Sequence, residues 1–119
     1  MKPGVTGLTR IINAAGYSWQ GFQAAFKYEA AFRQELFLCL VLTPIALVFG
    51  ETGLEKAILI GCLFIILIAE ILNSAIEALV DRFDGDINEY FGRAKDMGSA
   101  AVFLAFMNLG ICWFLILFI

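Results

Sequence analysis

The sequence predicts an all-α membrane protein, with an amphipathic surface helix near the N-terminus followed by three transmembrane helices. Of its 119 residues, 61% are hydrophobic and only 16% are charged. An ordinary soluble domain is roughly 45–50% apolar and about 25% charged. Three long apolar segments alternate with short polar ones, as in a multi-pass membrane protein. The net charge of −3 argues against a nucleic-acid partner.

The first predicted element is a surface helix over residues about 7–28. Its apolar residues recur three and four positions apart, while its charged and amide side chains lie largely elsewhere on the helix. Aromatic residues on one face and cations on another are typical of a helix that lies in the membrane interface.

Three membrane spans follow, at about 30–49, 55–81 and 97–119, within one domain that covers residues 1–119. The uncharged part of the first span is too short for a ~30 Å hydrocarbon core, so we expect it to include residues from position 30 onward. Pro44 lies inside this span, where it could bend the helix. Residues 50–56 read as a tight polar turn and residues 81–96 as a polar loop.

The distribution of cations predicts the orientation of the chain. Lysine and arginine gather before the first span and in the loop over 81–96, whereas the turn over 50–56 has only Lys56 beside two glutamates. The positive-inside rule therefore places the N-terminus and the 81–96 loop in the cytoplasm.

A polar stripe marks the end of the second span, in AEILNSAIEALVDR (69–82). At 100° per residue its polar members share an arc of about 100°; they are Glu70, Asn73, Ser74, Glu77 and Asp81. An ionisable group at the centre of a membrane helix costs about 2.5–3.5 kcal/mol, whereas an interhelical hydrogen bond returns about 0.6 kcal/mol. This comparison favours a functional stripe over interhelical polar contacts. The chain contains no histidine, so acid–base chemistry would require Asp, Glu, Lys or Tyr.

The third span opens with GRAKDMGSA (92–100), in which Lys95, Asp96 and Ser99 share one helical face. These residues could form a phosphate clamp, with Lys95 neutralising phosphate while carboxylates hold Mg²⁺. They could also be ordinary interface charges that extend toward water. No P-loop, dinucleotide-binding or soluble-kinase motif occurs in the sequence. The three cysteines lie far apart in apolar runs, and we expect packing roles for them instead of metal ligation or disulfides.

Three segments carry a resemblance to a known family: RIINAAGYSWQGFQAAFKYEAAFRQE (10–35), AEILNSAIEALVDR (69–82) and GRAKDMGSAA (92–101). Together they resemble the prokaryotic diacylglycerol kinases, which are small integral-membrane lipid kinases. The resemblance implies a homotrimeric helical bundle in the bacterial inner membrane, with active sites shared between neighbouring subunits at the cytoplasmic interface. It also implies the phosphorylation of diacylglycerol to phosphatidic acid by MgATP.

The resemblance assigns roles by position. The general base is Glu70, with Asn73 beside it, and the Mg²⁺ ligands are Glu29 and Glu77. The ATP-binding positions are Arg10, Tyr17, Glu29, Glu77, Asp86, Asn88, Lys95 and Asp96. The lipid-substrate positions are Ala14, Ser18, Trp19, Arg33, Glu35, Glu70 and Ser99. Residues 86–90 read DINEY where the family often has EYHEL, which makes the adenine contacts a point of departure.

Other interpretations stay open at this stage. A branch of the family prefers undecaprenol as the acceptor. From a different class, a small transporter could use Glu70 for protons or cations, but it would need a polar path to both faces, and the stripe opens to one side only. A purely structural subunit would leave the stripe unexplained.

Overall fold

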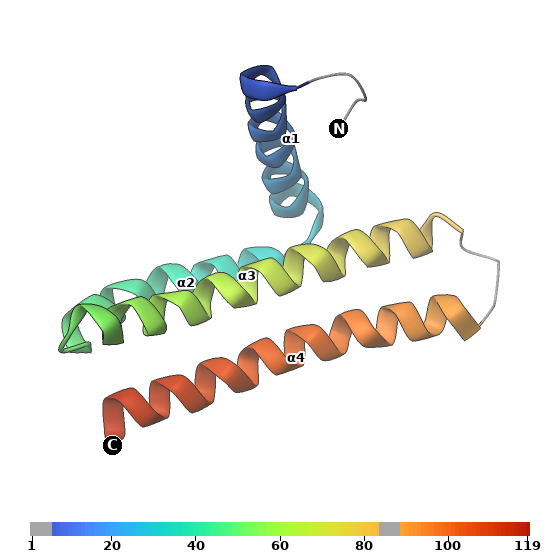
Figure 1. Cartoon of the computed structure of the whole chain (residues 1–119). Helices are drawn as coiled ribbons and strands as arrows, with labels where there is room; N and C mark the ends of the chain where they lie inside the picture. Colours follow the sequence, from blue (N-terminus) through green and yellow to red (C-terminus); the bar gives the residue numbers. More distant parts are fainter. Residues whose placement is uncertain (1–5, 84–88) are drawn as a thin grey trace.

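The computed structural model describes residues 6–83 and 89–119 and consists there of four helices (Figure 1). Helix α1 spans Gly7–Tyr28, α2 spans Ala30–Phe49, α3 spans Gly53–Asp81 and α4 spans Glu89–Phe118. The last three are long and apolar enough to cross a membrane. The predicted fold class, an all-helical membrane protein with a separate N-terminal helix, is confirmed.

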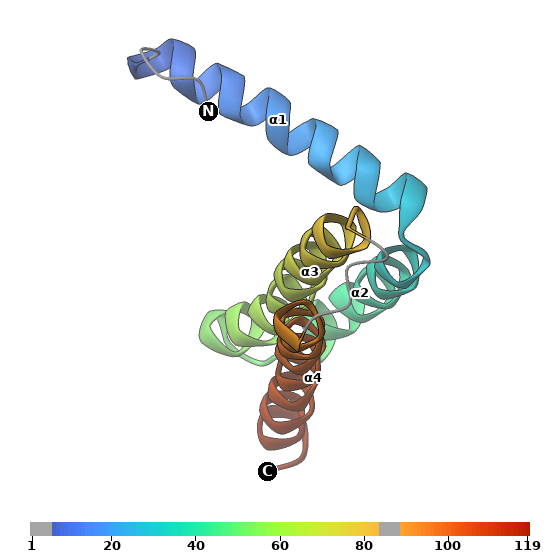
Figure 2. The same ribbon diagram turned by 90° about the vertical axis from the view of Figure 1, so that its right-hand side faces the viewer.

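Helix α3 is the centre of the bundle, because it packs against both α2 and α4. The chain reverses between successive spans, so α2 and α4 both run antiparallel to α3 (Figure 1). Leu59 and Ile66 of α3 are fully buried between these neighbours. Helix α1 leaves the bundle at the start of α2 and extends away from the three spans (Figure 2).

The turn between α2 and α3 depends on two residues. A Cβ at Gly50 would lie 2.8 Å from the carbonyl oxygen of Ala46 and 2.8 Å from Cγ of Lys56, so only glycine fits without displacement. Thr52 then caps α3, accepting a 3.1 Å hydrogen bond from the backbone N–H of Glu55. The chain therefore enters the second span immediately after a tight reversal.

Two features of the spans differ from the expectation or refine it. Helix α4 begins at Glu89. Part of the expected polar loop over 81–96 is therefore helical, and this polar helical stretch leads directly into the apolar part of α4. Helix α2 continues through Pro44 without interruption. Beside it, the Thr43 hydroxyl donates to the Cys39 carbonyl at 2.7 Å. With 29 residues, α3 is about 44 Å long and extends beyond a ~30 Å hydrocarbon core.

Candidate active site

Glu70 is the most deeply buried carboxylate of the polar stripe, with 5% of its surface exposed. Ser74, one turn further along α3, donates its hydroxyl to Oε2 of Glu70 at 3.2 Å. The carboxyl group of Glu35, on α2, lies close enough to that of Glu70 for the two to interact electrostatically. Within the described part of the chain, Oε2 of Glu35 is buried without a hydrogen-bond partner. Two carboxyl groups from different helices therefore meet at this depth, where a proton-accepting group would be shielded from water.

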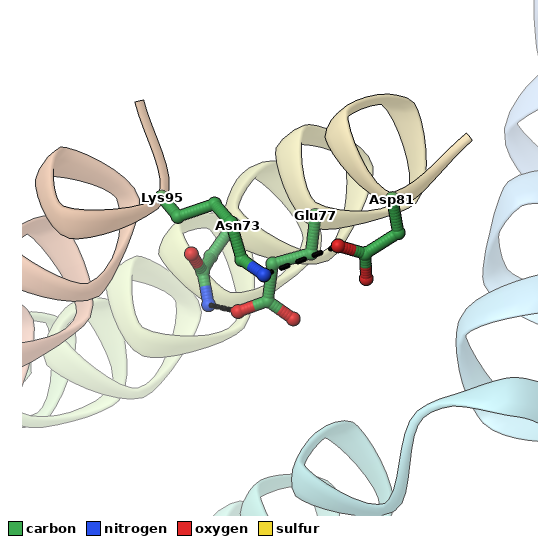
Figure 3. A network of polar contacts seen from close by, with 4 residues as sticks. All are labelled: Asn73, Glu77, Asp81 and Lys95. Carbon is green, nitrogen blue, oxygen red and sulfur yellow. Dashed lines mark hydrogen bonds and ion pairs between the residues drawn. The ribbon is translucent and has the colours of Figure 1, made fainter. Parts of the chain in front are cut away.

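Asn73 and Glu77 form the next pair along the stripe (Figure 3). Nδ2 of Asn73 donates to Oε1 of Glu77 at 3.1 Å. Oδ1 of Asn73 is buried and has no hydrogen-bond partner among residues 6–83 and 89–119. This oxygen faces the backbone of Gly98 on α4, where a side chain would collide with it. The Glu77 carboxylate is a suitable ligand for Mg²⁺, whereas Oδ1 of Asn73 is packed against Gly98.

Lys95 reaches the same end of α3 from α4. Its Nζ lies 3.1 Å from Oδ1 of Asp81, and both side chains are substantially exposed, at 46% and 63% (Figure 3). The pair places a cation within about one turn of Glu77 along the stripe. Lys95 is thus positioned beside the acidic residues, as a phosphate-binding cation would need to be.

Glu29 is the extended residue that separates α1 from α2. It lines a groove of about 350 Å³ between α1 and α3, together with Gly21, Ala24, Ala25, Tyr28, Ile71, Ser74, Ala75 and Ala78. Arg33 stabilises this junction: its Nη1 donates to the carbonyls of Phe26 at 2.6 Å and Lys27 at 3.2 Å, at the end of α1. Through these bonds Arg33 caps the C-terminal end of α1, and its role as a lipid-substrate position stays a prediction.

An apolar cavity of about 470 Å³ lies where α1 meets α2 and α3. Its lining residues are Trp19, Phe22, Gln23, Phe26, Phe32, Leu36 and Leu67. Trp19 is one of the predicted lipid positions. Ser18 and Ala14 are two further predicted lipid positions. The Ser18 hydroxyl donates to the carbonyl of Ala14 at 2.9 Å, a contact within α1.

The structure does not gather all predicted positions at one place in a single chain. Arg10 and Tyr17 are exposed on α1, which extends away from the spans (Figure 2). Asp96 and Ser99 are exposed on α4. Asp86 and Asn88 lie outside the described residues. Across those that are described, no group of three or more His, Cys, Asp or Glu side chains could hold a metal ion.

The sequence did not predict the roles of two residues at this site, Ser74 and Gly98. Ser74 was placed on the polar face, but its hydroxyl was given no role, although a serine four residues after a glutamate on a helix is within reach of that glutamate. Gly98 lies inside the GRAKDMGSA segment, where a glycine within a helix is a signal for close packing. The spacing of residues along the sequence does not show that Gly98 packs against Asn73 of α3.

These features define a small multi-pass membrane protein whose longest acidic stripe lies on its central helix, with a lysine at one end and a buried carboxyl pair at the other. Residues 16–117 match the model of the prokaryotic diacylglycerol kinase family. The chain belongs to that family.

Three relatives illustrate the similarity, each of them a diacylglycerol kinase by name. The protein from Escherichia coli is 49% identical over 117 residues, covering 98% of this chain and 96% of its own length. That from Haemophilus influenzae is 48% identical over 113 residues, covering 95% and 96%. That from Helicobacter pylori is 32% identical over 113 residues, covering 95% and 88%.

Proposed function

We propose that this protein transfers the γ-phosphoryl group of ATP to the hydroxyl of diacylglycerol, forming phosphatidic acid at the cytoplasmic face of the bacterial inner membrane. The observation that carries the proposal is the stripe on α3, which runs from the buried Glu70 to the exposed Asp81–Lys95 pair. A lipid hydroxyl at acyl depth and a water-soluble nucleotide can both reach such a stripe. The family membership supports the same reaction.

In the proposed reaction Glu70 accepts the proton of the lipid hydroxyl. The freed oxygen forms a bond to the γ-phosphorus as the bond from that phosphorus to the β,γ-bridging oxygen breaks, and ADP leaves. The proton passes to water after product release. The hydrogen bond from Ser74 holds Oε2 of Glu70 in place. Such transfer depends mainly on positioning and electrostatics, so few side chains suffice.

The nucleotide would be held at the outer end of the stripe. Lys95 would contact phosphate oxygens, and Glu29 and Glu77 would hold Mg²⁺, with the Asn73 amide orienting Oε1 of Glu77. When bound, Mg²⁺ would neutralise charge on the phosphates. Oxygen ligands of this kind fit Mg²⁺.

The two metal carboxylates point to a site shared between chains. Glu29 lines a groove against one face of α3, about 60–160° around the helix from Glu77 at 100° per residue; the α3 residues in that groove are Ile71, Ser74, Ala75 and Ala78. Arg10 and Tyr17 also project from the part of α1 that leaves its own bundle. A neighbouring chain would receive these groups, in keeping with a homotrimer whose active sites are composite.

The apolar cavity beside Trp19 supplies a place for an acyl chain. It is lined almost wholly by hydrophobic side chains and opens between the surface helix and the membrane spans. A lipid with its chain there would carry its polar end toward the surface helix. Diacylglycerol and undecaprenol are distinguished by offering both acceptors side by side in one assay.

The test of the proposal is the Glu70→Gln variant, assayed for transfer of label from γ-labelled ATP to diacylglycerol. We expect transfer to be abolished while the oligomer, measured by light scattering in detergent, stays intact. Glu51→Gln is the matched control, because Glu51 is exposed in the turn at the opposite end of α3. Retained transfer in Glu70→Gln would overturn the assignment, and ATP-independent ion flux through proteoliposomes would favour a transporter instead.

A further inference from the structure

A second polar cluster lies between α3 and α4, away from the stripe. Asn108 of α4 donates Nδ2 to Sγ of Cys62 on α3 at 3.4 Å. Oδ1 of the same amide accepts from Sγ of Cys112 at 3.6 Å. The two thiols are also close enough to influence each other electrostatically. Two cysteines that are far apart in the sequence therefore meet across a helix interface, held by one amide.

This cluster is distinct from the candidate active site. Cys62 lies eight residues before Glu70, about 12 Å away along α3. Cys62 is also buried, with 2% of its surface exposed. Next to it, Trp113 of α4 donates its indole N–H to the Leu59 carbonyl at 3.1 Å. The Asn108 amide therefore bridges the two thiols at the contact between α3 and α4.

We propose that Cys62 and Cys112 form a dithiol site that binds a soft divalent metal ion of the mercuric type, linking α3 to α4. Paired sulfur ligands select soft metals. A divalent ion that displaces both thiol protons forms a bis-thiolate complex without net charge, whereas a charged complex would be costly at this depth. With Hg²⁺ supplied as HgCl₂, two Hg–S bonds form, two Hg–Cl bonds break, and two protons leave with two chloride ions.

The amide of Asn108 suits both states of the site. In the metal-free protein it satisfies one thiol as donor and the other as acceptor. After metal binding, Nδ2 can still donate to the Cys62 sulfur, and Oδ1 loses its thiol donor and becomes available to the metal. Cys39 offers no such partner: its Sγ lies 3.7 Å from the Leu63 carbonyl, and it serves as an internal control.

The experiment titrates the purified protein in lipid nanodiscs with HgCl₂ and counts free thiols and bound mercury after dialysis against excess 2-mercaptoethanol. We expect the wild type and Cys39→Ser to retain one mercury per chain, with two thiols lost for each metal bound. In Cys62→Ser and Cys112→Ser, at most one free thiol should disappear for each mercury bound. These variants should release the metal to 2-mercaptoethanol during dialysis. One thiol per mercury in the wild type, or a release from Cys39→Ser equal to that from Cys62→Ser, overturns the proposal.

A second measurement needs no variant and so does not depend on whether the serine substitutions fold. Mercury-loaded wild-type protein is cleaved between α3 and α4, and the fragments are separated under denaturing conditions. We expect the α3 and α4 fragments to migrate together until a dithiol is added. Fragments that separate without the dithiol, from protein that still carries mercury, overturn the inter-helix link.

Discussion

Replacing Gly98 by alanine tests how closely α4 must approach Asn73. A Cβ at this position would fall inside van der Waals contact of Asn73 Oδ1 and lie 3.3 Å from its Cγ and 3.6 Å from Cδ1 of Ile76. Overpacking of this kind costs about 1–3 kcal/mol. The strain can be relieved by moving α4, which shifts Lys95 relative to Asp81, or by turning the Asn73 amide, which disturbs its 3.1 Å hydrogen bond to Glu77.

If that cost falls on the geometry of the site, kcat for diacylglycerol phosphorylation should drop by about fivefold to about 150-fold. Gly110→Ala is the matched control, because it lies on the same helix and its Cβ would meet nothing within 4 Å. Alanine at a helix interior gains about 0.5–1 kcal/mol over glycine. The control should therefore keep full activity and unfold at the same or a higher temperature.

The two variants together separate packing from helix propensity. Wild-type kcat in Gly98→Ala, with the protein folded, would refute the argument that Gly98 positions Asn73. An equal loss in Gly110→Ala would also refute it, since that change adds no contact within the described structure.

Three further predictions concern polar contacts near the site. Arg33→Gln removes the cap on α1, so limited proteolysis at the α1–α2 junction should speed up and stability should fall by about 1 kcal/mol. Lys95→Met should raise the apparent KM for ATP by roughly tenfold or more, because a charged hydrogen bond contributes about 1.5–3 kcal/mol. Asp81→Asn should change that KM little, since an exposed ion pair contributes about 0.2–1 kcal/mol. Ser74→Ala leaves Glu70 without its donor and should lower kcat by about two- to tenfold, with unchanged KM for ATP, in a steady-state assay.

The helices of this protein could be predicted from the sequence because lipid imposes a simple rule. A membrane helix must satisfy its backbone internally, so long apolar runs report helices almost directly. The amphipathic period of residues 7–28 likewise predicted α1. The start of α4 could not be predicted in this way, because its first residues lie beyond the apolar part of the helix. Outside the membrane, intrinsic helix propensities are too weak to distinguish a helix from a loop over so few residues.

The same distinction applies to the candidate active site: features within one helix could be predicted, and contacts between helices could not. Helical periodicity places Glu70, Asn73 and Glu77 on one face, because that depends only on the rotation of a single helix. Contacts between helices depend on which faces meet and how closely, and no spacing rule relates Gly98 to Asn73 or Cys62 to Cys112.

The two inter-helix contacts of α3 with α4 follow one physical pattern. At Gly98 the absence of a side chain lets a backbone approach an amide oxygen, and at Asn108 an amide fills the space between two thiols. Without a hydrophobic force between helices in lipid, small residues and polar contacts determine which faces pack together. Gly98 and Asn108 are ten residues apart on α4, so the same pairing of α3 and α4 that packs Gly98 against Asn73 also brings the two cysteines to one interface. A substitution that shifts α4 at Gly98 should therefore also weaken mercury retention at the dithiol site, although that site lies more than two helical turns from Glu70.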